Sequence, residues 1–327
     1  LFDAGQASWL VSVLAVGLIV FAFLVNIAGN RLIGAISKIT AVIKIGGIVA
    51  FAGAALWAAG FSFAPASNGV GEETSITGFL AAVALAILAY KGFTTITNSG
   101  GEVEDPHKNV GRAIMISLAI CVVVYLLVAF AVGSSLTVDE IVNAKDYALA
   151  EAARPSLGQT GVWFTVAIAI VATASGLLAS VFAVSRMLAM LTDMEIIPHR
   201  HFGMPGGIQK HTLVYTVVLA ALLAAFFDLS RIASLGAIFY LVMDIAIHWG
   251  VMRHLRDDVG AKSWVLISAM VLDAAVLVAF IIMKGAADSM IVVIAVIGIG
   301  AIFAFEKFFL SRHRTTESRS NAHGHAH

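Results

Sequence analysis

The chain has 327 residues, of which 60% are apolar and only 12% are charged, and its mean hydropathy is +0.96. A soluble domain is about half apolar and about a quarter charged, so this composition excludes a large soluble core and indicates a polytopic protein of the lipid bilayer. The formal net charge of zero gives no sign of a nucleic-acid partner, and the single Cys121 excludes a disulfide framework.

Apolar segments long enough to cross a bilayer, which takes about 20 residues, recur along the whole chain. Polar loops containing Gly, Pro, Asn and Asp separate them. The sixth is the shortest, and 139–153 is expected to form a short amphipathic surface helix. We expect nine spans, at 8–27, 33–59, 76–100, 111–135, 160–191, 212–227, 229–252, 263–283 and 288–310.

Lysine and arginine are distributed unequally between the two sides that these spans define. Lys44 and Lys91 lie within spans, and four of the others fall on one side: Lys145, Arg154, Arg231 and Lys284. Fourteen fall on the opposite side, namely Arg31, Lys38, Lys108, Arg112, Arg186, Arg200, Lys210, Arg253, Arg256, Lys262, Lys307, Arg312, Arg314 and Arg319. The excess of positive charge predicts that this side, which includes the C-terminus, is cytoplasmic.

The third span carries an interruption. Residues 79–88 are almost wholly apolar, and then Tyr90, Lys91 and Gly92 place a charge and a glycine inside the span. A broken membrane helix exposes backbone N–H and C=O groups, which is tolerated only beside a cavity or inside protein. A break at 89–94 therefore predicts a binding site of the kind found in transporters.

Three motifs carry a resemblance to a known family. The first is YKGFTTITNSGGEVEDPHKNVGRAI at 90–114; the second runs from Ser185-Arg186-Met187-Leu188 to Asp193 and Ile197-Pro198; the third is Asn26-x-x-Gly29 before the helix that contains Lys44. Together they resemble the amino acid permeases of the amino acid–polyamine–organocation (APC) superfamily. In the second motif, Thr192 and Met194 stand where arginine and glycine are usual.

The resemblance implies an all-α LeuT-like fold of two inverted five-helix repeats followed by two extra helices. Such permeases have about twelve spans, so the nine spans here correspond to the fourth to twelfth, and three would precede the chain, which does not begin with Met. A permease domain at 1–310 would then contain an incomplete first repeat, a second repeat at about 76–254 and the extra helices at about 263–310. The Arg- and His-rich segment 311–327 would be a disordered cytoplasmic tail.

The resemblance also implies that the backbone of the interrupted helix contacts the amino group of the substrate. The expected substrate-binding residues are Leu88, Ala89, Tyr90, Lys91, Gly92, Phe93 and Thr94. Lys91 is unexpected beside an amine. It either binds a carboxylate or another anion, or it points into the cytoplasmic vestibule as a solvated charge.

Lys44 resembles a lysine that, in some proton-coupled relatives, occupies the place of a sodium ion. A buried lysine can titrate near neutral pH, so Lys44 would load and release a proton. Its expected partners are Thr173, Ser175 and Gly176, although the lysine could instead extend to the interface and the small residues could serve close helix packing.

Other ionisable groups are candidates for proton relay or gating. Asp244 and His248 lie one helical turn apart and form either a proton relay or a mutually satisfied pair, whereas Asp273 is alone in the next span. Glu102, Glu104, Lys108 and Arg112 are expected to form a cytoplasmic gate or salt-bridge cluster. No metal-ligand spacing, phosphate loop or nucleophile motif indicates a cofactor or an enzyme.

These features favour a proton-coupled secondary transporter of amino acids in a prokaryotic plasma membrane, working by symport or exchange. Two alternatives remain open. One is a polyamine or organic-cation carrier, against which Lys91 argues mildly because like charges repel. The other is a truncated permease-like protein that does not transport and acts as a sensor or interaction partner.

Overall fold

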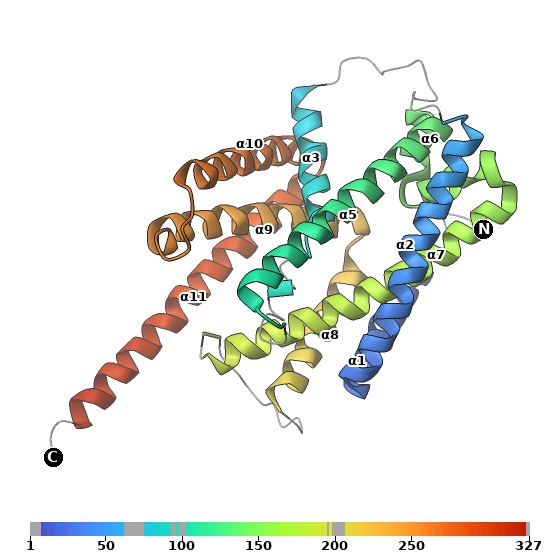
Figure 1. Cartoon of the computed structure of the whole chain (residues 1–327). Helices are drawn as coiled ribbons and strands as arrows, with labels where there is room; N and C mark the ends of the chain where they lie inside the picture. The colour runs from blue at the N-terminus through green and yellow to red at the C-terminus, as the bar shows by residue number, and fades with distance from the viewer. Residues whose placement is uncertain are drawn as a thin grey trace. The chain divides into compact units, whose positions relative to one another are not determined.

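The computed structural model describes residues 8–61, 75–92, 96–97, 103–194, 196–197 and 207–324. Every regular element in these ranges is helical (Figure 1). They are α1 Ser8–Ala28, α2 Asn30–Ala58, α3 Ile76–Tyr90, α5 Pro106–Ser135, α6 Val138–Ala144, η2 Lys145–Tyr147, α7 Ala148–Asp193, α8 Ile208–Phe226, α9 Leu229–Gly250, η3 Val251–Leu255, α10 Ser263–Ala287 and α11 Ser289–Gly324. The predicted all-α class is confirmed.

The helices have the length and composition of membrane spans. Eight of those within the described residues are long and apolar enough to cross a bilayer, and they match the expected spans in order. α3 is the exception, because it is apolar but has only 15 residues. Large apolar side chains such as Val42, Met115 and Ile297 are exposed, as lipid-facing residues must be. The chain is a multi-pass membrane protein.

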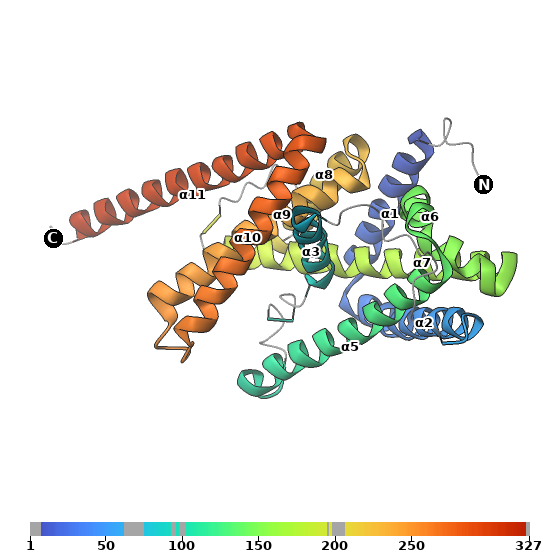
Figure 2. The ribbon, with the colours of Figure 1, turned by 90° about the horizontal axis from the view of Figure 1, so that it is seen from above.

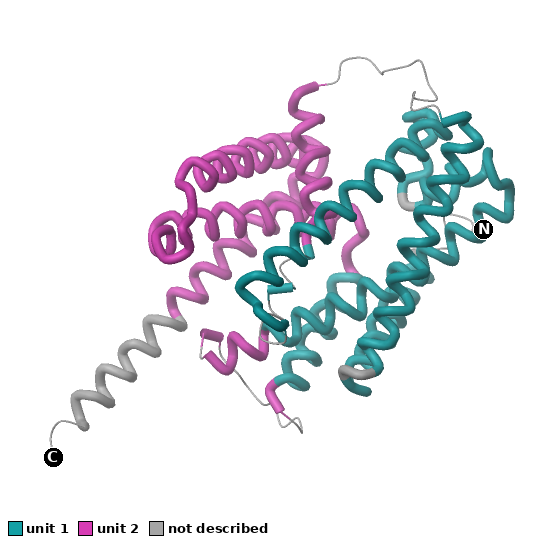
Figure 3. Tube along the Cα trace, viewed as in Figure 1, with its two compact units in different colours: residues 1–72, 92–187, 209–225 teal, residues 73–91, 188–208, 226–327 magenta. Residues whose placement is uncertain are grey.

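The chain divides into two compact units, which Figure 3 distinguishes by colour. Unit 1 comprises 1–72, 92–187 and 209–225, and unit 2 comprises 73–91, 188–208 and 226–327. The division therefore falls between Lys91 and Gly92. These units group residues by packing and do not follow the predicted repeats, whose boundaries stay a prediction.

In unit 1, α2 packs against α5, and small residues allow the close approach. Phe51 and Ala52 of α2 share a core with Ala131 of α5 and with Ala152 and Ala153 at the start of α7. Small residues in place of bulky ones let membrane helices approach each other and gain dispersion contacts.

The segment between α5 and α7 begins with a capping box. The Glu140 backbone N–H donates to the Thr137 hydroxyl at 3.3 Å, and the Thr137 N–H donates to the Glu140 carboxylate at 2.8 Å. The Thr137 N–H, assisted by the Thr137 hydroxyl, lowers the pKa of Glu140. The amphipathic helix expected at 139–153 is thus divided into α6, η2 and the first turns of α7, because Lys145 adopts a positive φ of 46°.

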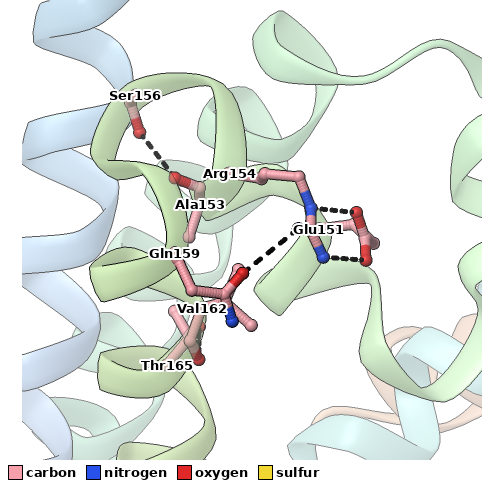
Figure 4. Close-up of polar contacts among 7 residues, drawn as sticks. All are labelled: Glu151, Ala153, Arg154, Ser156, Gln159, Val162 and Thr165. Carbon is pink, nitrogen blue, oxygen red and sulfur yellow. Dashed lines mark hydrogen bonds and ion pairs between the residues drawn. The ribbon is translucent and has the colours of Figure 1, made fainter. Parts of the chain in front are cut away.

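α7 bends near its beginning. Pro155 lacks a backbone N–H, and Gly158 departs from helical geometry with φ 60° and ψ −152°. Figure 4 shows the Arg154 guanidinium donating to both Glu151 oxygens, at 2.9 and 3.0 Å, and reaching Gln159 beyond the bend at 3.4 Å. The membrane-spanning part of α7 therefore starts after Gly158, close to the expected start at 160.

Unit 2 is built from α3, α9, α10 and α11. α10 packs against both α3 and α9, which lie beside it in Figure 2, and α11 packs against α9 and α10. The core contains Ala81 and Ala84 of α3, Leu241 of α9 and Phe280 of α10, all at most 1% exposed. The two alanines leave room for Phe280 to fill the space between the helices.

α11 is assigned as far as Gly324, and the side chains beyond Phe308 lie outside the described part of the chain. The disorder expected for 311–327 stays a prediction.

We predict that Phe280→Ala destabilises the protein by roughly 2 kcal/mol, because a cavity on the order of 100 Å³ costs ~24 cal/mol per Å³. Ile282→Ala on the same helix is the control, since Ile282 is 60% exposed and leaves no cavity. Unfolding by a denaturing detergent measures both. Equal stability of the two variants would contradict the assigned core.

Candidate functional site

The predicted interruption lies at the end of α3. Ser75 caps the start of this helix, accepting from the Gly78 N–H at 2.9 Å, and the helix ends at Tyr90. Lys91 then takes an extended conformation with ψ 145°, and Gly92 has φ +128°. Fifteen residues rise only about 22 Å, so α3 alone is shorter than the ~30 Å hydrocarbon core of a bilayer.

Glycine is required where the chain turns out of the helix. A side chain at Gly92 would meet no atom within 4 Å, so space is not what limits this position. The positive φ is the constraint, because L-residues rarely adopt it. The sequence placed the break at 89–94, and the described residues up to Gly92 agree; Phe93 and Thr94 lie outside the described residues.

The residues that precede the break differ in exposure. Leu88 is half-buried, and its methyl groups lie 3.5 and 3.7 Å from the position that a Cβ on Gly236 of α9 would occupy. Leu88 therefore packs against α9. Ala89 is exposed and Tyr90 is half-buried. A substrate-binding role for these residues stays a prediction.

Lys91 is paired with an acid of unit 2. Its ammonium contacts the Asp244 carboxylate of α9 in a salt bridge and lies 5.4 Å from the centre of the Tyr240 ring. The two charged side chains are only 7% and 18% exposed. This arrangement disagrees with the view of Lys91 as a solvated charge, because the Asp244 carboxylate and the aromatic face replace water around the ammonium.

The expected pairing of Asp244 with His248 is wrong. Although one helical turn separates them on α9, Asp244 turns to Lys91, and His248 Nδ1 lies 3.6 Å from the Asp273 carboxylate of α10. Asp273 is therefore not alone. The physical reason is that an ammonium needs a counter-ion more than a neutral imidazole does.

The surroundings of Lys44 are only partly as expected. Ser175 is buried, but its hydroxyl partner is Thr40 of α2, at 2.9 Å, rather than Lys44. Lys44 is half-buried one turn further along α2, and Thr173 and Gly176 are exposed. The hydrogen bond from Thr40 to Ser175 thus brings the side of α2 that precedes Lys44 against α7, in the region that the sequence indicated.

An apolar cavity of about 470 Å³ lies beyond Lys44 in unit 1. Ile48 and Phe51 of α2 line it, together with Thr165 and Thr173 of α7. Lys44 stands one turn before Ile48 on the same helix. Thr173 therefore belongs to the wall of this cavity.

The predicted gate residues are exposed. Glu104, Lys108 and Arg112 all lie on the surface, and no ion pair joins them in the part of the chain that the structure describes. The Glu104 carbonyl oxygen accepts from the Asn109 side chain at 2.6 Å. Glu102 lies outside the described residues, and the role of all four as a cytoplasmic gate stays a prediction.

Two of the family motifs also form defined contacts. The Asn26 side chain donates to the Ala22 carbonyl oxygen at 2.8 Å, just before the turn at Gly29. The Ser185 carbonyl oxygen accepts from the buried Thr212 hydroxyl at 2.9 Å, which joins α7 to α8 within unit 1.

Comparison with known proteins decides the family. A model of the family described as "Amino acid permease" matches residues 2–318. The chain belongs to the amino acid permease family. This is a family of transporters rather than enzymes, and the superfamily suggested by the three motifs is confirmed.

Three individual relatives each share less than 30% sequence identity with this chain. This permease is 28% identical over 284 residues to "Inner membrane transport protein YbaT" of Escherichia coli, covering 86% of this chain and 64% of that protein. It is 26% identical over 275 residues to "Uncharacterized protein MJ0609" of Methanocaldococcus jannaschii, covering 83% and 61%. "Serine/threonine exchanger SteT" of Bacillus subtilis is 29% identical over 157 residues, which cover 48% of this chain and 35% of that protein. The permease chain spans less than two thirds of the length of these relatives.

Sequence reasoning missed three contacts of this permease. These contacts are Tyr240 under Lys91, Asp273 beside His248 and Thr40 on Ser175, and each joins two different helices or the end of a helix to another helix. The only available signal was that an isolated intramembrane acid such as Asp273 requires a partner. This signal indicates that Asp273 has a partner but does not identify the partner.

We predict that Lys91→Met destabilises the permease by roughly 3–5 kcal/mol, because it leaves the Asp244 carboxylate without its counter-ion. The double variant Lys91→Met/Asp244→Asn should recover most of this loss. Unfolding in mixed detergent micelles measures both.

Arg231→Gln is the control, because Arg231 pairs with Asp288 at 2.9 Å but is 39% exposed. An exposed pair contributes less than about 1 kcal/mol. If Lys91→Met were no more destabilising than Arg231→Gln, the pairing with Asp244 would have no energetic importance.

Proposed function

We propose that this permease is a secondary active transporter of amino acids, coupled to protons, that works by alternating access around the interrupted helix at 89–94. The observation that carries the proposal is the end of α3 at Tyr90, followed by the extended Lys91 and the positive φ of Gly92, in a chain of the amino acid permease family.

The end of α3 suits the amino group of a substrate. The carboxyl end of a helix carries a partial negative charge, which favours a cation placed near its last turn. α3 presents this end part-way through the bilayer, where low dielectric strengthens the attraction. Residues 88–94 would contact the substrate, and Gly92 would allow its close approach to the backbone.

Lys91 and Asp244 favour a zwitterionic substrate over a polyamine. A substrate carboxylate can replace Asp244 beside the ammonium, while the substrate amino group takes the carboxylate that is released. A dication offers no group for Lys91 and is repelled by it. Relatives named "Serine/threonine exchanger SteT" and "Aromatic amino acid transport protein AroP" are in keeping with an amino acid substrate.

Proton coupling in this proposal passes through Lys44. Lys44 is half-buried on a membrane helix, one turn before Ile48, which lines the apolar cavity of unit 1. Lys44 would bind a proton while the site faces one side and release it on the other. The excess of basic residues on that side supports a cytoplasmic C-terminus, and the protein would lie in the plasma membrane.

Uptake of labelled amino acids into liposomes, driven by a pH gradient, tests the proposal on the protein as its host produces it. We expect Gly92→Ala to reduce uptake severely, because a non-glycine residue at this φ is strained by about 1–3 kcal/mol. Gly285→Ala is the control, since Gly285 lies in α10 without positive φ and with nothing within 4 Å. Absence of uptake by the wild-type protein would overturn the function.

We expect Lys44→Ala to remove the pH dependence of the uptake rate at saturating substrate, because the transported proton would lose its binding group. Lys38→Ala, an exposed lysine of the same helix, should leave the pH profile unchanged. Initial rates measured over a series of external pH values make the comparison. A Lys44→Ala profile identical to the wild type would exclude coupling through this residue.

A further inference from the structure

Four ionisable side chains of unit 2 form one group, which we call the unit 2 charge cluster: Lys91, Asp244, His248 and Asp273. They come from the end of α3, from α9 and from α10. Lys91 forms a salt bridge with Asp244, and His248 Nδ1 lies 3.6 Å from the Asp273 carboxylate. Asp273 also interacts electrostatically with both Asp244 and Lys91, so the two pairs act on each other.

The charges of this cluster do not balance without a proton. The Lys91 ammonium neutralises the Asp244 carboxylate, which leaves Asp273 beside an imidazole that is neutral unless protonated. The cluster therefore carries one net negative charge with neutral His248 and none after one proton binds. Because a net charge among membrane helices is costly, the low-dielectric setting favours uptake of that proton.

The geometry of His248 has a vacant position for this proton. Its Nδ1 atom is buried and has no hydrogen-bond partner among the described residues. At 3.6 Å, the Asp273 oxygen is slightly beyond hydrogen-bond distance. A proton placed between the two atoms would convert this unsatisfied contact into a charge-assisted hydrogen bond, which is shorter and stronger than a neutral one.

We propose that His248 and Asp273 bind one exchangeable proton inside the membrane, and that the Lys91–Asp244 pair connects this proton to the interrupted helix. The binding of the proton stands on the geometry of unit 2, whereas its use in transport rests on the proposed function. The site lies in unit 2 and is separate from Lys44, which belongs to unit 1.

Loss of the proton changes the forces on Lys91. With Asp273 ionised, two carboxylates of neighbouring helices attract one ammonium and repel each other. With the proton bound, its positive charge offsets the Asp273 carboxylate, and Asp244 remains paired with Lys91. Protonation thus lowers the negative charge that competes for the Lys91 ammonium at the residue where α3 ends, so that Lys91 is more available to a substrate carboxylate at 88–94.

Other charged or titratable groups stand near the helices of this cluster. Tyr240 of α9 lies beneath Lys91, and Glu306 of α11 lines a cavity of about 450 Å³ together with Tyr240. Lys284 of α10 lies over the Phe280 ring, 5.9 Å from its centre. Beyond His248, the η3 turn carries Arg253 and His254. Among the described residues, no ion pair joins these groups to His248 or Asp273.

Infrared difference spectra of the purified protein in lipid nanodiscs, recorded between alkaline and acidic pH, test the proton site without requiring transport. We expect histidine-ring and carboxyl bands that change together in the wild type and vanish in His248→Gln/Asp273→Asn. The control Arg231→Gln/Asp288→Asn removes another ion pair of unit 2 and should retain these bands.

A second measurement does not depend on whether the double variant folds. In wild-type protein carrying ¹⁵N-labelled histidine, the His248 Nδ1 resonance should shift with pH, and Asp273→Asn should alter that shift. Bands that persist in the double variant, or a His248 resonance that ignores pH, would overturn the proposal.

Uptake measurements separate this inference from the proposed function. Coupled sites change each other's affinity by about 5–150-fold, so acidification should raise the apparent substrate affinity of the wild type within that range. In His248→Gln/Asp273→Asn the effect should fall to about onefold. A pH-responsive His248 in a protein without amino acid uptake would support the proton site and refute the function; retained pH coupling in the double variant would refute the link to transport.

Discussion

An ammonium group on a membrane helix must have a counter-ion within reach, and this requirement organises unit 2. Lys91 stands where α3 ends, and Asp244 of α9 neutralises it. The packing around the pair follows from the same need, because α9 can approach α3 only where Gly236 accommodates Leu88 and where Ala81 and Ala84 make room for Phe280. The charge pair and the small residues therefore both depend on the close packing of α3, α9 and α10.

Unit 1 differs in this respect, because no ion pair of Lys44 is described among its residues. Lys44 stands one turn before Ile48, which lines an apolar cavity, and one turn after Thr40, which donates a hydrogen bond to Ser175. One lysine of this permease is thus held by an acid and the other lies on an apolar helix surface. The proposed roles of Lys91 in anion recognition and of Lys44 in proton exchange rest on this contrast.

The sequence alone was sufficient to predict the features that depend on residues close together along the chain. Apolar length placed the spans, Lys91 and Gly92 placed the break in α3, and polar residues placed the surface segment before α7. It was insufficient for pairings between helices. Asp244 and His248 share a face of α9 and looked like partners, yet Asp244 pairs with Lys91 of the α3 end and His248 lies beside Asp273 of α10, because the choice depends on packing between helices. The division at Lys145 was missed for a related reason: a positive φ at a lysine has no sequence signature.

The separation between Lys91 and Asp244 has a consequence for how the protein is made. The two residues are 153 positions apart, so α3 leaves the ribosome long before its counter-ion exists. A 15-residue helix ending in an unpaired ammonium is a poor substrate for independent insertion. α3 must therefore wait at the insertion machinery, or at the membrane surface, until α9 has been synthesised. Membrane integration of α3 would thus be coupled to the synthesis of α9.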